Sequence, residues 1–379
     1  MEIESLDELA ALLAGPAPVP AGVCLQDLDL TGSPRLADRL AAAQAAGLVV
    51  LGGRYPPDLL QTLADGGATV LPSVPGVPFQ PYRAQLYQPG ELYAGLQNGY
   101  AATVDAGCYR WYLDRREVPD IAGATFAAIH DASITDALED LLGPEERPLV
   151  AVMGGHGVQR GSDSYFSAAH LGSLLARCGA LVATGGGPGV MEAVNLGAAV
   201  AGRGREDLPE IVGRLSAVPT FQDVAAWAAV ALDVVDQLDH DTHGDPGTVA
   251  SIGIPTWFYG HEPPNTFADR IAKYFSNALR EDVLLARAAG GVIVLPGAAG
   301  TVQEIFQAAT RSYYATDAAA PPIVLVDADH WTRTLPVWPL LHELAADRPM
   351  RRRITLCRNG SDAVAALIAM GVPLHPPAG

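Results

Sequence analysis

The chain has 379 residues, is 49% hydrophobic and 17% charged, and carries a formal net charge of −18, so it should fold into about two globular domains. A chain this acidic is repelled by phosphate backbones and anionic lipids, which argues against nucleic acid and membranes as partners. The four cysteines form no CxxC pair, and no secretory signal or apolar run of about 18 residues is visible. We therefore expect a cytoplasmic protein with no metal site and no cofactor.

The first part of the chain reads as a small α/β domain of unknown role over residues 1–145. Apolar runs at 48–51 and 68–71 predict two strands, with a helix at 57–63 between them. A proline-rich connection and a helical stretch around 120–142 follow. The sequence GPEER at 143–147 then breaks the chain before a new strand, which places the domain boundary there.

The second part, residues 146–345, alternates short apolar runs with helical patterns, and residues 346–379 are predicted to form a C-terminal extension. The expected strands are 149–153, 180–183, 251–257, 291–295 and 322–326; the expected helices are 164–176, 190–201, 221–238, 267–280 and 302–310. Continuous apolar runs joined by helices are typical of buried parallel strands with crossover connections. The pattern predicts a Rossmann-like, doubly wound α/β fold.

Three of these strands run into glycine-rich loops, at 154–157, 185–189 and 296–301. Loops at the carboxyl ends of parallel strands bind ligands, because glycine lets the backbone approach a phosphate and the next helix offers free N–H groups. A tight turn alone would also favour glycine, but less readily at three loops. Val190 stands where GxGxxG needs its third glycine, and nothing matches a P-loop.

The stretch 267–280 also indicates function. Two sets of residues recur at helical spacing: Phe267, Ile271, Phe275 and Ala278 on a core face, and Asp269, Lys273, Asn277 and Arg280 on another. This pattern aligns Lys273, the single lysine, with Arg280, either as part of a binding site or as an ordinary solvated face.

Three further residues allow a structural and a functional interpretation. Thr301 and Glu304 fit a TxxE capping box, so Glu304 is either a helix cap or a site carboxylate. Glu192 is either a site residue or a favourable charge at a helix N-terminus. His261 begins a loop that either contacts base or ribose or leads into a helix capped by Asn265 or Thr266.

Taken together, the GGGPGVM loop at 185–191, the arginine at position 280 and the PGAAGTVQE segment at 296–304 resemble the LOG ("lonely guy") family, long mislabelled as lysine decarboxylases. The resemblance covers roughly 148–336 and suits a long form with an N-terminal extension. It implies hydrolysis of the N-glycosidic bond of a nucleoside 5′-monophosphate to free base and ribose 5-phosphate, in a homodimer. A decarboxylase using pyridoxal would need a Schiff-base lysine, and only Lys273 is present.

The resemblance also implies roles for individual residues. Arg280 and Glu304 would be catalytic; Gly186, Gly187, Gly297, Gly300 and Thr301 would hold phosphate; Gly154, Gly155, His156, Glu192, His261, Lys273 and Asn277 would line the nucleotide site. Ala298, Gln303 and Glu281 depart from the family pattern, which has glycine, glutamate and a basic residue there. Two alternatives stay open: a nucleotide sensor without turnover, and an enzyme acting on a related ribosyl phosphate.

Overall fold

The computed structural model describes residues 1–15, 19–43, 45–118, 120–203, 207–241, 249–260, 262–316 and 320–376. His261 lies outside the described residues. The chain forms two compact units. The first comprises Met1–Leu86 and Trp111–Gly143, and the second comprises Tyr87–Arg110 and Pro144–Gly379.

This division differs from the expected domains in two respects. Residues 87–110 cluster with the second unit although they precede the predicted boundary. The residues expected to form a C-terminal extension also belong to the second unit, because β11 (Ile354–Cys357) pairs along its whole length with β10 (Ile323–Val326).

The first unit is built on a small parallel sheet with the strand order β1-β2-β3-β4. Its elements are β1 (Glu2–Ile3), α1 (Leu6–Ala14), β2 (Cys24–Gln26), α2 (Pro34–Ala42), β3 (Val49–Leu51), α3 (Leu59–Asp65), β4 (Thr69–Leu71) and α6 (Ile121–Leu142), with α5 (Val104–Glu117) spanning the change from one unit to the other. Leu25, Leu40, Val50 and Leu63 are among its core residues. The predicted strands at 48–51 and 68–71 and the helix at 120–142 are confirmed.

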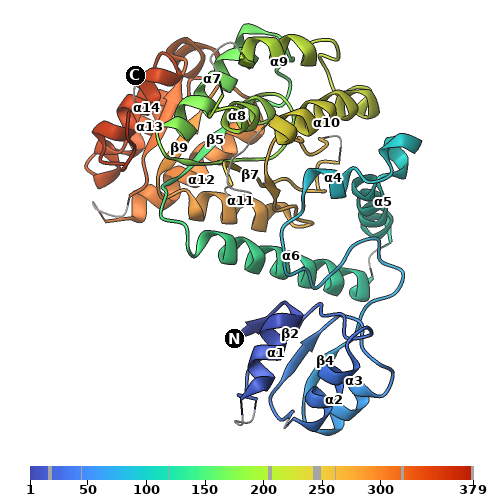
Figure 1. Ribbon diagram of the computed structural model, residues 1–379. Helices are drawn as coiled ribbons and strands as arrows, with labels where there is room; N and C mark the ends of the chain where they lie inside the picture. The colour runs from blue at the N-terminus through green and yellow to red at the C-terminus, as the bar shows by residue number, and fades with distance from the viewer. Residues whose placement is uncertain are drawn as a thin grey trace. The chain divides into compact units, whose positions relative to one another are not determined.

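The second unit holds a seven-stranded parallel sheet with the order β11-β10-β9-β5-β6-β7-β8 (Figure 1). Its other strands are β5 (Leu149–Met153), β6 (Leu181–Thr184), β7 (Ser251–Gly253), β8 (Arg270–Ile271) and β9 (Gly291–Val294). Its helices are α4 (Pro89–Leu92), α7 (Asp163–Arg177), α8 (Val190–Ala199), α9 (Asp207–Leu215), α10 (Val224–Asp241), α11 (Asn277–Arg287), α12 (Ala299–Tyr314), α13 (Val337–Leu344) and α14 (Gly360–Ala369). With β8 set aside as an added edge strand, this is the Rossmann order 3-2-1-4-5-6. The predicted doubly wound α/β fold is confirmed.

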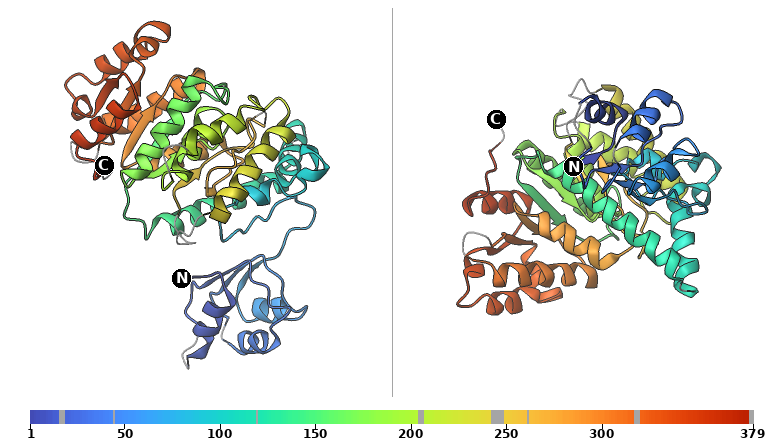
Figure 2. Two further views of the ribbon diagram at one scale, coloured as in Figure 1. Left: turned by 45° about the horizontal axis from the view of Figure 1, so that its top comes forward. Right: turned by 90° about the horizontal axis from the view of Figure 1, so that it is seen from below.

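The order in which the chain adds strands to this sheet changes sides between β5 and β9, while all strands stay parallel. From β5 the chain moves outward through β6 and β7, and it then returns to the other side of β5 to form β9 and β10. Helices α7, α8 and α14 cover one face of the sheet, and α11 and α12 cover the other (Figures 1 and 2). Ligands bind outside the strand ends at such a reversal, which makes the carboxyl ends of β5 and β9 the place to look for a site.

Two glycines allow helices α7 and α8 to approach backbone to backbone. A Cβ on Gly172 would lie 2.0 Å from the Val194 carbonyl oxygen, and one on Gly197 would lie 1.8 Å from that of Ala169. Neither position tolerates a side chain, so this close packing fixes α8 against the sheet. The glycine loop that precedes α8 is held in place with it.

The predicted helix over 267–280 is wrong except at its C-terminal end. Residues 270–271 form β8, which pairs with β7, and α11 begins only after its N-cap Ser276, whose hydroxyl accepts a hydrogen bond from the Leu279 amide at 3.3 Å. The Asp269 carboxylate accepts from the Ala250 and Ser251 amides at 2.6 and 2.9 Å, which ties this segment to the sheet. Strand pairing with a distant partner overrides the local helical periodicity.

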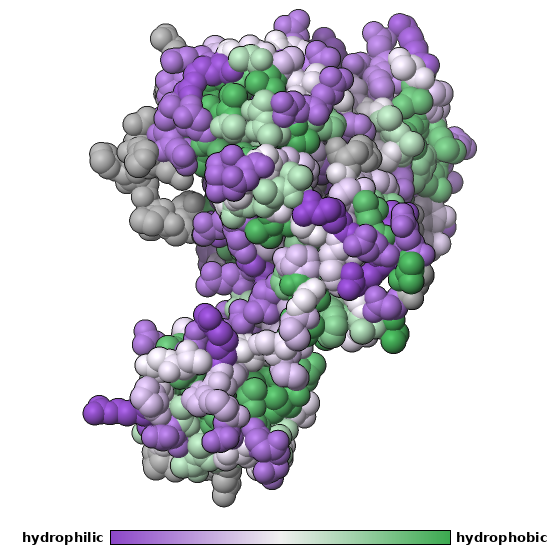
Figure 3. Space-filling model, turned by 90° about the vertical axis from the view of Figure 1, so that its right-hand side faces the viewer, coloured by the Kyte–Doolittle hydropathy of each residue, from purple (hydrophilic) through white to green (hydrophobic). Residues whose placement is uncertain are grey.

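Both units have a mixed surface. On the face shown in Figure 3, hydrophobic patches are separated by hydrophilic side chains. Among the described residues, no helix has the length and apolar character that crossing a membrane requires.

Candidate functional site

The glycine loops that follow β5, β6 and β9 meet at one edge of the seven-stranded sheet. The Gly155 amide donates to the Pro296 carbonyl at 3.0 Å, which joins the loops on either side of the reversal point. Gly189 has φ +70°, and a Cβ there would lie 2.5 Å from the His156 carbonyl oxygen. Glycine is therefore required at position 189 for conformation and for space.

A buried polar network holds the loop after β6 from below. The Thr184 hydroxyl accepts from the Gly186 amide at 3.0 Å and donates to the Asn195 side chain at 2.7 Å. Asn265 donates to the Gly187 carbonyl at 3.1 Å, and its backbone amide donates to the Gly186 carbonyl at 2.8 Å. These hydrogen bonds fix the loop after β6 from within the protein, independently of any ligand.

Arg280 lies in the first turn of α11, and its guanidinium reaches three other elements. Its Nε donates to the Ile254 carbonyl at 2.6 Å, and its Nη2 donates to the Gly185 carbonyl at 3.2 Å. Its Nη1 lies 3.1 Å from Glu304 Oε1. The side chain is only 9% exposed. Arg280 thus links the loops after β6 and β7 to α12.

Glu304 is the carboxylate partner of this arginine. Its side chain is 13% exposed, and burial raises the pKa of its carboxyl above the usual value even though Arg280 lowers it. Glu281 and Glu262 raise the pKa further. A carboxyl with a raised pKa beside a cation, at the ligand edge of a Rossmann sheet, has the features of an acid–base group.

Of the two interpretations of Glu304, the capping role is wrong. Helix α12 starts at Ala299, its N-cap is Ala298, and no side chain caps it. Glu304 therefore lies beyond the capping position, and Thr301 lies inside the helix rather than at its N-cap. The backbone donors of the first turn of α12 stay available for an anion.

Three of the five residues predicted to hold phosphate, Gly297, Gly300 and Thr301, lie at this uncapped N-terminus. Gly297 packs so closely that a Cβ on it would lie 2.2 Å from Thr301 Oγ1, whereas a Cβ on Gly300 would point into open space. Ala298 has φ −118°, an ordinary conformation for any residue. The departure from the family glycine at position 298 therefore costs no backbone strain.

The other two departures from the family pattern contact each other. Gln303 Nε2 donates to Glu281 Oε2 at 2.6 Å, and Asn277 Nδ2 donates to Glu281 Oε1 at 2.8 Å. Where the family pattern has a basic residue and a glutamate, this chain has a glutamate and a glutamine joined by a hydrogen bond. The pair adds a negative charge next to Arg280 and Glu304.

His156 and Glu262 form a second ion pair on the solvent side of the site. His156 Nδ1 lies 3.0 Å from Glu262 Oε1, and this hydrogen bond raises the pKa of the imidazole. A Cβ on Gly187 would lie 3.5 Å from Glu262 Oε2, so the carboxylate lies beside the loop after β6. The pair joins the loops that follow β5 and β7.

Two predicted nucleotide contacts have buried partners of their own. Lys273 Nζ lies 2.6 Å from Asp105 Oδ1 and is 2% exposed, so it is not aligned with Arg280 as the helical pattern predicted. Both carboxylate oxygens of Glu192 accept from Arg160, and each of these side chains is 1% exposed. These residues support the scaffold under the site.

Several residues of the site were not assigned to it from the sequence, although Asn265 was considered as a helix cap and Glu281 and Gln303 as departures from the family pattern. Asn265, Asn195 and Thr184 hold the loop after β6, and Glu281 and Gln303 stand beside the arginine and glutamate. The amides and the threonine give no signal in the sequence, because polar residues next to glycines are common in turns. The paired departures at 281 and 303 were visible, but their contact was not.

Comparison with known proteins places the similarity in the second unit. A family model described as "possible lysine decarboxylase" matches residues 234–367, and a model of the SLOG cluster4 family matches residues 147–205. The two matches include all three glycine loops, Arg280 and Glu304. No curated protein matches the sequence.

Two solved structures align with this chain over almost their whole length. A molybdenum cofactor binding protein from Rippkaea orientalis is 17% identical, with 59% of this chain and 98% of that chain covered and a TM-score of 0.35. A Moco carrier protein from Chlamydomonas reinhardtii is 16% identical, with the same coverage and a TM-score of 0.36.

The two family models by themselves support the predicted resemblance to the LOG family, over the segments of the second unit that they match.

Proposed function

We propose that this protein hydrolyses the N-glycosidic bond of a nucleoside 5′-monophosphate, with Arg280 and Glu304 as the catalytic residues. The observation that carries the proposal is the 3.1 Å contact between these side chains at the reversal point of the sheet, beside the uncapped N-terminus of α12. The proposal also rests on the resemblance to the LOG family.

The reaction cleaves the N-glycosidic bond. The hydroxyl of a water molecule adds to C1′, and the base takes up a proton. As the bond between C1′ and the base nitrogen breaks, positive charge develops on the ribose ring as an oxocarbenium ion. The ionised Glu304 stabilises that charge and accepts a proton from the attacking water, whose hydroxyl bonds to C1′. The departing base takes up a proton from solvent, and Glu304 returns its proton to solvent, so that water is the only co-substrate. Arg280 keeps Glu304 ionised and orients it.

The 5′-phosphate is expected at the first turn of α12. Gly297, Gly300 and Thr301 lie there, and the helix presents unsatisfied amides and the positive end of its dipole. Gly186 and Gly187 bring a second stretch of rigid backbone to the same edge.

A nucleotide sensor without turnover is the second candidate. It is favoured by one observation: each of the three nitrogens of Arg280 already donates within the protein, to Ile254, Gly185 and Glu304, which uses three of its five N–H donors, so the arginine has a structural role that does not require a ligand. An enzyme acting on another ribosyl phosphate would use the same phosphate site.

We also propose a cytoplasmic homodimer. Tyr314 on α12 and Leu340 on α13 are 81% and 60% exposed, and these two helices contact each other. Exposed apolar side chains on adjacent helices suit an interface between subunits. Light scattering coupled to size exclusion would show twice the monomer mass for the native chain and a lower mass for Tyr314→Glu.

The experiment that tests the function is incubation of the purified full-length chain with AMP, GMP, CMP, UMP and IMP, followed by chromatography of the products. Free base and ribose 5-phosphate in equal amounts support hydrolysis and identify the preferred base. Binding of a nucleotide by calorimetry with no base released from any of them would favour the sensor. Ribosyl phosphates without a base, tested in parallel, address the third alternative.

A further inference from the structure

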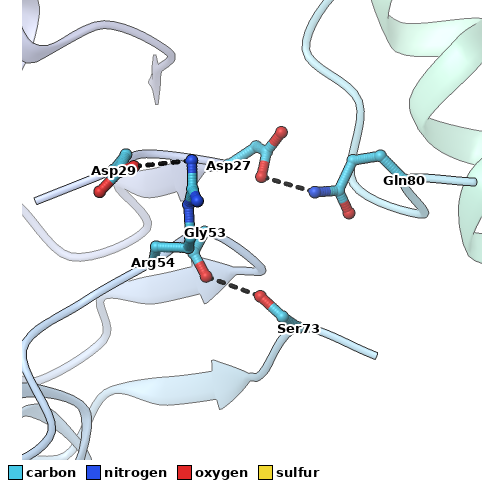
Figure 4. Close-up of a pocket in the computed structure, with 6 residues that line it drawn as sticks. All are labelled: Asp27, Asp29, Gly53, Arg54, Ser73 and Gln80. Carbon is cyan, nitrogen blue, oxygen red and sulfur yellow. Dashed lines mark hydrogen bonds and ion pairs between the residues drawn. The ribbon is translucent and has the colours of Figure 1, made fainter. Parts of the chain in front are cut away.

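The first unit has a cavity of its own at the carboxyl ends of its strands. The cavity has a volume of about 420 Å³ and is lined by Asp27, Asp29, Gly53, Arg54, Ser73 and Gln80 (Figure 4). Asp27 and Asp29 follow β2, Gly53 and Arg54 follow β3, and Ser73 follows β4. This is the edge at which open parallel sheets bind their ligands, and the proposed nucleotide hydrolysis makes no use of it.

Backbone hydrogen bonds fix the loops that form this cavity. The Asp27 amide donates to the Leu51 carbonyl at 2.9 Å, and the Arg54 amide donates to the Leu28 carbonyl at 2.8 Å. Gly53 has φ +81°, and a Cβ there would lie 2.4 Å from the Leu28 carbonyl oxygen. The loops after β2 and β3 therefore pack directly against each other, and the cavity is preformed.

The side chains within the cavity are held by one another. Gln80 Nε2 donates to Asp27 Oδ1 at 2.7 Å, and Arg54 Nη2 lies 2.9 Å from Asp29 Oδ2. The Ser73 hydroxyl donates to the Gly53 carbonyl at 2.6 Å. Asp29 Oδ1 accepts twice more, from the amide and the hydroxyl of Thr31. Asp29 is thus almost fully occupied.

Asp27, unlike Asp29, keeps capacity to accept hydrogen bonds. It has φ +51°, an uncommon conformation for a residue other than glycine. Burial raises the pKa of its carboxyl, with opposing contributions from the Gly53 amide and from Arg83 and Arg54. A carboxylate has room for about four hydrogen bonds, so Asp27 can accept further donors from a ligand. The Gln80 side-chain oxygen beside it offers another acceptor.

Charge and size narrow the class of ligand. An anion would meet two carboxylates and one arginine that Asp29 already engages. A metal ion would face that guanidinium, and the cavity is far larger than an ion needs; about 300–1,000 Å³ is the range of small-molecule sites. A neutral molecule that donates hydrogen bonds through adjacent hydroxyl groups satisfies the free acceptors without adding charge.

We propose that this cavity binds the vicinal diol of a ribose ring, in a nucleoside or free pentose, with Asp27 as the principal acceptor and Gln80 as the second. An acidic side chain at the end of a parallel strand binds ribose hydroxyls in this way in dinucleotide sites. The inference does not depend on the proposed hydrolysis, because the cavity belongs to the first unit alone.

The test is saturation-transfer NMR on the full-length chain with D-ribose, adenosine and 2′-deoxyadenosine as probes, followed by titration. We expect ribose and adenosine to bind and 2′-deoxyadenosine to bind more weakly, because it lacks one hydroxyl of the diol. Asp27→Asn should weaken adenosine binding by about tenfold or more, as expected for loss of a hydrogen bond to a charged group. Asparagine tolerates positive φ, so this variant should keep its fold.

Two controls separate this cavity from the candidate active site. Asp38→Asn, on the exposed side of α2, should leave adenosine binding unchanged, and Glu304→Gln reports whether the ligand occupies the candidate active site instead. Binding lost in Glu304→Gln but retained in Asp27→Asn would overturn the proposal and assign the ligand to the other site. Absence of ribose and adenosine binding, or binding of Mg²⁺ or Ca²⁺ that Asp27→Asn abolishes, would also overturn it.

Discussion

The second unit contains two ion pairs whose cations, Lys273 and Arg280, a single sequence pattern placed on one helix face, and the two pairs differ in burial and in the partners of their carboxylates. Lys273 and Asp105 are both about fully buried, and Asp105 also accepts from Trp257 Nε1 at 2.8 Å and from the Tyr100 hydroxyl at 2.7 Å. Arg280 and Glu304 are partly exposed at the ligand edge of the sheet. A pair whose acceptor has three donors inside the protein serves the fold, whereas a pair at the ligand edge of the sheet can serve chemistry.

The largest effect is expected from the Arg280–Glu304 pair at the ligand edge. Replacing Arg280 with lysine keeps a positive charge but loses the forked contacts to Gly185 and Ile254. Turnover of the preferred nucleotide should fall by about 10²–10³-fold, the range for removal of one group that stabilises developing charge. Steady-state kinetics would measure this fall, and unchanged turnover would remove Arg280 from the catalytic site.

The buried pair should respond in stability instead. Lys273→Met leaves Asp105 without its cation and should lower the free energy of unfolding by about 3–5 kcal/mol, as breaking a buried ion pair does. Denaturant unfolding of the full chain would measure the change. Turnover per folded molecule should stay within about twofold. A large fall in turnover with no loss of stability would reverse the assignment of the two pairs.

A smaller effect is expected from removing the charge of Glu281, which raises the pKa of Glu304. Both burial and the nearby carboxylates raise the pKa of Glu304, and hydrolysis needs its ionised form, so activity should rise with pH through a midpoint above the ordinary value of 4.5. Glu281→Gln removes one of the charges that raise this pKa, and the acid limb of the pH–rate profile should therefore move to lower pH. Asp282→Asn, next along the helix, serves as the matched control. A shift to higher pH would contradict this electrostatic account.

The smallest effect is expected at Glu4, a carboxyl that has no basic partner among the described residues. In the first unit, burial and then Asp140 and Asp136 raise the pKa of Glu4 to about 7. The folded unit then binds this proton more tightly than the unfolded chain, so the contribution of Glu4 to stability is full below pH 4.5 and is lost as the pH rises through about 7. Because Glu4 is partly solvated, the loss should be on the order of 1 kcal/mol. Glu4→Gln should flatten this dependence in thermal unfolding, and an equally steep dependence in the variant would count against it.

How much of this could be predicted from sequence depended on the range of the interactions. Apolar runs and glycine loops are local, and the strands that begin at 149, 181, 251, 291 and 323 lie close to where the pattern put them. Lys273 was misplaced because spacings of three and four residues also occur by chance in a segment that alternates short strand and loop. Its partner Asp105 is 168 positions away, beyond any periodic signal.

The candidate site was likewise predictable in its residue types but not in its contacts. Arg280 and Glu304 could be selected by resemblance, yet their separation by 24 positions carries no geometric information. The sequence showed Glu281 and Gln303 as two independent departures. Only the fold reveals that they hydrogen-bond, and that they change the charge beside Glu304 together.

The most direct test of the central claim is to measure turnover and nucleotide affinity together in Glu304→Gln. The change removes the carboxylate charge while keeping size and a hydrogen-bonding group beside Arg280. The account predicts base release reduced by at least about 10²-fold, with the dissociation constant from calorimetry and the melting temperature close to those of the native chain. Full turnover in the variant, or loss of nucleotide binding and folding together, would contradict the assignment of Glu304 as the catalytic carboxylate.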